Sequence, residues 1–111
     1  MKKDDLVYVR HMLDVARSVM AKVSSIKRTE FDQDENLQLA TVHLIQTIGE
    51  AAARTSNEFR TAHPEIPWRT IVGMRHRIVH DYLAVNFDLV WEVAKNDLPP
   101  LAAQLQTIVD G

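Results

Sequence analysis

A short stretch of the sequence holds its densest group of side chains that could do chemistry. Six ionisable residues fall between positions 75 and 82: Arg75, His76, Arg77, His80, Asp81 and Tyr82. Histidine exchanges a proton near neutral pH, and arginine presents a planar set of donors that matches a phosphate group. A histidine that deprotonates a ribose 2′-hydroxyl and an arginine that holds the phosphate would suffice for RNA cleavage without a metal ion.

The spacing of these residues permits a joint site but does not require one. On a helix, Arg75 and Tyr82 lie seven residues apart and nearly in line, whereas His80 lies roughly 140° round the axis from Arg75. A long arginine side chain can still reach a shared pocket. A site built from two copies of the chain would relax the constraint further.

An ordinary solvent-facing helix is the structural alternative, in which Arg77 and Asp81 would form an i,i+4 pair of opposite charge. One observation favours a site. Arg75 shares a helical stripe with Val72 and Val79, and a cation on an apolar stripe needs a partner or a ligand.

His76 and His80 are also spaced as a metal-binding pair would be, since residues i and i+4 lie on one side of a helix. However, Arg77 follows His76, so the H-E-x-x-H pattern is absent, and the neighbouring arginines would oppose a dication. A third ligand would have to come from another part of the chain. We therefore expect no metal and no other cofactor.

The composition indicates one globular domain over residues 1–111, with 46% hydrophobic and 25% charged residues. No apolar run is long enough to span a membrane, and the opening M-K-K-D-D argues against a signal peptide. Cysteine is absent, which excludes disulfides and fits a cytoplasmic protein. Because the net charge is -2, an RNA substrate would need a local cationic patch.

Apolar spacing predicts an all-α, up-and-down bundle of four to five helices. Asn86 is a candidate N-cap for the fourth helix, and Pro99 and Pro100 are expected to break or kink the chain. The expected helices are Asp4 to about Ser25, Asn36 to about Glu58, Trp68 to about Leu83, Phe87 to about Asn96 and Leu101 to Val109.

Four further features are expected from local patterns. Residues 27–35 form a charged loop, with a short turn around 29–32. Gly49 lies inside a helix, where glycine costs about 1 kcal/mol relative to alanine, so it suggests a close approach by another helix. Trp68 and Trp91 lie on apolar sides as core or interface anchors. Glu50 and Arg54 are spaced for a surface salt bridge.

The motif R-x4-H-x-Y is carried by Arg75, His80 and Tyr82, and its surroundings resemble HEPN-domain proteins of the HepT type. The likeness extends over essentially the whole chain. It includes I-P-W-R-T-I-V-G-M-R-H-R-I-V-H-D-Y (66–82), I-G-E-A-A (48–52), V-W-E-V (90–93) and N-D-L-P-P-L (96–101). Such proteins usually place a polar residue, often asparagine, directly after the arginine, where this chain has His76.

The resemblance implies a small helical toxin that forms a homodimer with its site at the dimer interface. It implies a metal-independent ribonuclease in which Arg75 and His80 act at the scissile phosphate of an RNA substrate and His76 is auxiliary. The expected partner is a minimal nucleotidyltransferase antitoxin, which transfers AMP to Tyr82 and thereby blocks the site.

Two alternatives remain open at this stage. The acidic net charge and the histidine at position 76 also suit a non-catalytic module that binds a nucleotide or a partner protein. A structural dimer with a vestigial site is the other alternative.

Overall fold

The computed structural model describes residues 3–79 and 84–111, and these form helices joined by short connections. Within those residues there is no β-strand, and Val79 and Val85 pair through an isolated antiparallel bridge. The elements are α1 (Lys3–Val23), α2 (Arg28–Asp32), α3 (Glu35–Ala53), α4 (Asn57–Ala62), α5 (Trp68–Val72), α6 (Met74–Ile78), α7 (Phe87–Glu92), the π-helical turn η1 (Val93–Asp97) and α8 (Leu98–Asp110).

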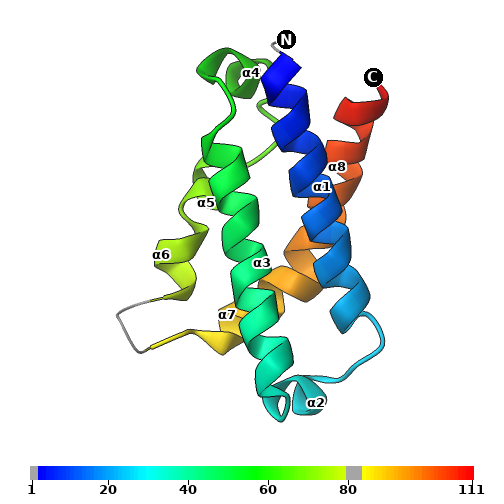
Figure 1. Cartoon of the computed structure of the whole chain (residues 1–111), viewed down its shortest axis with the longest axis vertical. Helices are drawn as coiled ribbons and strands as arrows, with labels where there is room; N and C mark the ends of the chain where they lie inside the picture. The colour runs from blue at the N-terminus through cyan, green and yellow to red at the C-terminus, as the bar shows by residue number, and fades with distance from the viewer. Residues whose placement is uncertain (1–2, 80–83) are drawn as a thin grey trace.

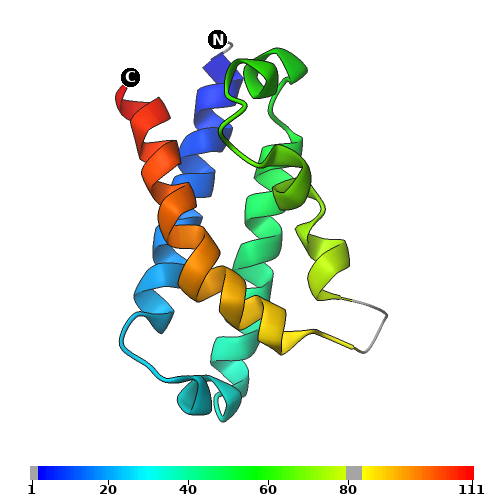
Figure 2. The same ribbon diagram turned by 180° about the vertical axis from the view of Figure 1, so that it is seen from behind.

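The helices run alternately up and down, which confirms the predicted all-α bundle. α1 descends, α3 returns, α5 and α6 descend again, and α7, η1 and α8 return (Figure 1). The first and last helices therefore lie side by side, with both ends of the chain at one end of the bundle (Figure 2). The interior between α1, α3 and α8 holds apolar side chains at helical spacing, among them Val9, Met12, Ala16, Val19, Ile45, Ile48, Ala52, Leu101 and Leu105.

The second predicted helix is too long, because α3 ends at Ala53 and α4 starts separately after Ser56. The Ser56 hydroxyl accepts a hydrogen bond from the Phe59 N–H at 3.1 Å, which is an N-cap. Asp5 of α1, only 2% exposed, accepts from the Ser56 N–H at 2.7 Å and from its hydroxyl at 2.8 Å. This buried carboxylate fixes α4 to the start of α1.

The third predicted helix is divided at Gly73 and ends sooner than expected in the described residues. α6 stops at Ile78, and Val79 has extended backbone angles (φ -118°, ψ 100°). The Ile78 carbonyl accepts a hydrogen bond from the Asn86 N–H at 2.7 Å, so it pairs outside the helix. The remainder of the predicted helix, residues 80–83, lies outside the described residues.

The last part of the chain confirms one expectation and corrects another. The Asn86 side chain accepts from the Leu89 N–H at 3.0 Å, so it is the N-cap that the sequence predicted. Pro99 and Pro100 do not break the chain. They occupy the first turn of α8, where a missing N–H is tolerated, and the preceding π-helical turn bonds the Leu98 N–H to the Val93 carbonyl.

The charged segment after α1 is more ordered than the loop that the sequence suggests, because it contains α2. Phe31 of this helix is fully buried, and its ring centroid lies 5.1 Å from that of Trp91. Arg28 contacts Asp32 and Asp88 at 2.7 Å each, and the hydrogen bonds with Asp32 first and then Asp88 raise the pKa of Arg28. α2 is thus fixed to α7.

The close approach of another helix, which the sequence predicts at Gly49, is present between α3 and α5. A Cβ atom at this position would lie 2.9 Å from the Ile71 carbonyl oxygen, closer than real side chains come to backbone. The absence of a side chain is therefore what lets the two helices touch, and it sets the position of every residue on the neighbouring turn of α3.

We expect Gly49→Ala to destabilise the protein by about 1–3 kcal/mol, because the added methyl must push α5 away from α3. Urea unfolding would measure the change. Asn36→Ala, an exposed change on the same helix, should stay within about 0.5 kcal/mol of the wild type. Helix propensity alone predicts the opposite sign for Gly49→Ala, a gain of about 1 kcal/mol, and that result would contradict the close packing.

Candidate functional site

A small groove of about 170 Å³ lies between α3 and the pair α5 and α6. Its existence follows from the contact at Gly49, which brings the next turn of α3 beside the start of α6. The lining residues are Gln46, Gly49, Glu50 and Ala53 from α3, Val72 from α5, and Arg75 and His76 from α6. Two of the predicted site residues, Arg75 and His76, are thus brought together here.

The charged groups of this groove are open to a ligand. Glu50, Arg75 and His76 are all exposed. Within residues 3–79 and 84–111, none of the three forms a side-chain hydrogen bond or ion pair. The salt bridge expected between Glu50 and Arg54 is absent, so the Glu50 carboxylate has no partner in the described part of the chain.

The apolar stripe assigned to Arg75 is not a uniformly buried one, because Arg75 and Val72 are exposed whereas Val79 is partly buried against the core. The buried side of α5 and α6 is formed by Ile71, Met74 and Ile78, whereas Val72 is 38% exposed. Arg75 therefore needs no buried partner, and that argument for a site was wrong. What favours a site instead is the position of Arg75 in a groove beside exposed Val72 and beside His76, which has no side-chain partner in the described part of the chain.

The segment around the groove is locally cationic although the chain has a net charge of -2. Residues 66–79 contain no aspartate or glutamate, and their ionisable members are Arg69, Arg75, His76 and Arg77. At the groove itself the cation is Arg75, with His76 beside it in the chain, and the Glu50 carboxylate lines the same space.

The other predicted site residues, His80 and Tyr82, lie outside the described residues, as does Asp81. A joint site of Arg75, His80 and Tyr82 therefore stays a prediction. The same holds for the pairing of His76 with His80. Among residues 3–79 and 84–111, no three histidine, aspartate or glutamate side chains gather in a way that could hold a metal ion.

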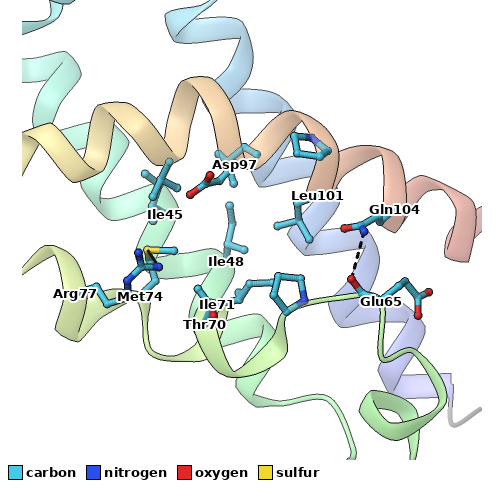
Figure 3. Close-up of a pocket in the computed structure, with 14 residues that line it drawn as sticks. Ile45, Ile48, Glu65, Thr70, Ile71, Met74, Arg77, Asp97, Leu101 and Gln104 are labelled. Carbon is cyan, nitrogen blue, oxygen red and sulfur yellow. Dashed lines mark hydrogen bonds between the residues drawn. The ribbon is translucent and has the colours of Figure 1, made fainter.

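A larger pocket, of about 450 Å³, lies on the other side of α5 and α6, where they face η1 and α8 (Figure 3). Core side chains such as Ile48, Ile71 and Leu101 line it. One edge is crossed by a hydrogen bond of 3.2 Å from the Gln104 amide to the Glu65 carbonyl.

Arg77 belongs to this larger pocket and not to the groove. Its guanidinium lies beside Met74, with Nη1 4.0 Å from Sδ (Figure 3). Arg75 and His76 line the groove, whereas Arg77 lines the larger pocket. Each residue of a helix is turned by about 100° from the one before it, so three consecutive side chains cannot all share one face. Sequence spacing alone had grouped all three.

Sequence reasoning did not identify Gln46 and Glu50 as members of the site. The signal that could have found them is Gly49, whose expected close contact implied that its neighbours on α3 would meet another helix. Glu50 had been assigned to a surface pair with Arg54, which the spacing equally allowed.

The fold and the groove define a small helical protein with exposed ionisable side chains at one surface groove, and comparison with known proteins identifies its family. The family model described as ribonuclease HepT-like matches residues 12–108. The chain belongs to the ribonuclease HepT-like family.

Two curated relatives align with this chain over nearly their full lengths. A protein of Caldanaerobacter subterraneus subsp. tengcongensis, provisionally named an RNase, is 33% identical over 92% of this chain and 91% of its own. A Thermococcus cleftensis protein, named "Probable ribonuclease HepT", is 29% identical over 97% of this chain and 98% of its own. The comparison with solved structures gave no significant match.

In the part of the chain that the structure describes, every helix is too short or too polar to cross a lipid bilayer.

Proposed function

We propose that this protein is a metal-independent ribonuclease that acts as the toxin of a type II toxin–antitoxin pair. The observation that carries the proposal is the groove of a ribonuclease HepT-like chain in which Arg75 and His76 are exposed beside each other and have no side-chain partner among residues 3–79 and 84–111. Exposed groups of these two kinds can bind the phosphate of an RNA strand.

Arg75 and His80 carry the chemistry in this proposal. His80 takes the proton of a ribose 2′-hydroxyl, and the resulting oxygen attacks the adjacent phosphorus. The bond to the 5′-oxygen breaks, that oxygen takes a proton from solvent water as it leaves, and a 2′,3′-cyclic phosphate remains. Arg75 balances the negative charge that grows on the phosphate oxygens. His76 assists in holding the substrate.

The active species in this proposal is a homodimer whose partner copies meet near the groove. Exposed apolar residues support that arrangement. Leu39 is 57% exposed and lies seven residues from Gln46, so both occupy one face of α3, and Val72 is exposed across the groove. A second copy covering this face would bury apolar surface and complete the site.

The proposed partner is a minimal nucleotidyltransferase antitoxin in the cytoplasm. It transfers AMP from ATP to the Tyr82 hydroxyl and releases pyrophosphate. An adenylyl group adds bulk and negative charge. Because Arg75 lies close to Tyr82 in the chain, that group would exclude RNA from the site by occupancy and by repulsion.

We expect the purified protein to cleave single-stranded RNA or tRNA in EDTA, and Arg75→Ala and His80→Ala each to lower the rate about 10²–10⁴-fold. Gel analysis of end-labelled RNA measures this. Arg10→Ala and His11→Ala, exposed positions on α1, serve as matched controls and should cleave like the wild type. Undiminished cleavage by His80→Ala would refute the assignment. Saturable RNA or nucleotide binding without any cleavage would favour the non-catalytic binding module.

Co-expression with the neighbouring nucleotidyltransferase gene should increase the intact mass of this protein in steps of one AMP. Tyr82→Phe should abolish the gain because it removes the acceptor hydroxyl. The chain has two tyrosines, so Tyr8→Phe is the matched control and should still be modified. Unchanged modification of Tyr82→Phe, or none of the wild type, would contradict the proposed regulation.

A further inference from the structure

We propose that Glu50 and Gln46 form a base-recognition subsite beside Arg75, and that it accepts a guanine next to the scissile phosphate. This subsite rests on the proposed ribonuclease function and specifies which RNA the site would prefer. Its residues come from α3, a different element from the one that carries Arg75 and His76.

The close packing at Gly49 places this subsite. Glu50 follows the residue whose missing side chain lets α3 touch α5, and it lines the same groove as Arg75 and His76 from α3. Gln46 lies four residues earlier and therefore on the same face of α3. The groove thus has a polar wall on α3 and a cationic wall on α6.

The groove has the size and surface of a site for one base. Its volume of about 170 Å³ is well below the roughly 300–1,000 Å³ of pockets for drug-sized ligands. Gly49, Ala53 and Val72 supply small apolar surfaces, against which the face of a flat ring can lie. Arg75 and His76 line the same groove. In this proposal they contact the phosphate attached to the nucleoside whose base the groove accepts.

The Glu50 carboxylate determines which of the four bases the subsite prefers. An ionised glutamate next to an RNA phosphate is repelled by it unless the ligand offers hydrogen-bond donors to the carboxylate. Guanine presents two adjacent donors on its Watson–Crick edge, N1–H and the 2-amino group, which a carboxylate can accept in parallel. Adenine, cytosine and uracil offer no such pair. The Gln46 amide can donate to the guanine O6.

The described residues leave Glu50 free for this role. No ion pair joins it to Arg75 or His76, although all three line the groove. A glutamate that merely oriented the histidine would be expected within bonding distance of the ring. The geometry therefore favours contact of the carboxylate with a ligand.

The test uses short single-stranded RNAs that differ at one base, and compares guanine, inosine and adenine at the position flanking the cut. Inosine lacks only the 2-amino group. The wild type should cleave the guanine substrate about 10- to 100-fold faster than the adenine one, with inosine between them. Glu50→Gln should cleave guanine and inosine substrates alike, whereas Glu35→Gln, an exposed change elsewhere on α3, should keep the wild-type preference.

Binding of the same RNAs in 2′-O-methyl form, which cannot be cleaved, separates the two proposals. Guanine-selective binding that is lost in Glu50→Gln, without cleavage by the wild type, would support the subsite and refute the nuclease. Cleavage by the wild type with equal rates for guanine and inosine would refute the subsite alone. Equal slowing of Glu50→Gln on every RNA, with a shifted pH profile, would also refute it and make Glu50 a positioning residue for His76.

Discussion

The passage of α3 past the Ile71 carbonyl oxygen is the contact on which the candidate site depends. At Gly49 a single Cβ atom would come within 2.9 Å of that oxygen, so the two helices lie closer here than a residue with a side chain permits. This contact holds α5 against α3. It also brings α6, which starts at Met74, beside the neighbouring turn of α3. Glu50 on one helix and Arg75 on the other then face a common groove without a bond between them. A larger residue at position 49 would widen this space and separate the wall that would read a base from the wall that would hold a phosphate.

The ionisable residues of α6 line two different spaces, and this separation decides which of them lie at the groove. Arg75 and His76 face α3, whereas Arg77 lies beside Met74 in a pocket lined by the core. The groove therefore combines a few small apolar surfaces with exposed ionisable groups that have no partner among the described residues. Unpaired groups of this kind are available for a ligand, whereas paired ones such as Arg28 with Asp32 and Asp88 are committed to holding helices together.

Much of the fold could be predicted from the sequence because apolar spacing reports directly which side of a helix is buried. The stripe on α1, the N-cap at Asn86 and the close contact at Gly49 all follow from local chemistry. The errors occur where tertiary contacts decide. The helix predicted from Asn36 to about Glu58 is interrupted where Ser56 donates to the buried carboxylate of Asp5, a contact between residues 51 positions apart that local spacing does not reveal. Pro99 and Pro100 fit into α8 because a π-helical turn precedes them. Glu50 was missed because its neighbour across the groove is 25 residues away in the chain.

Amide chemical shifts of the ¹⁵N-labelled protein, titrated with a short 2′-O-methyl RNA, test most directly whether this groove is where RNA binds. The two pockets have separate reporters, since Gly49, Glu50 and His76 lie at the groove, and Thr70, Leu101 and Gln104 lie at the larger pocket. We predict saturable shifts at the first set and little change at the second. Shifts confined to Thr70, Leu101 and Gln104, or no shifts at saturating RNA, would contradict the account.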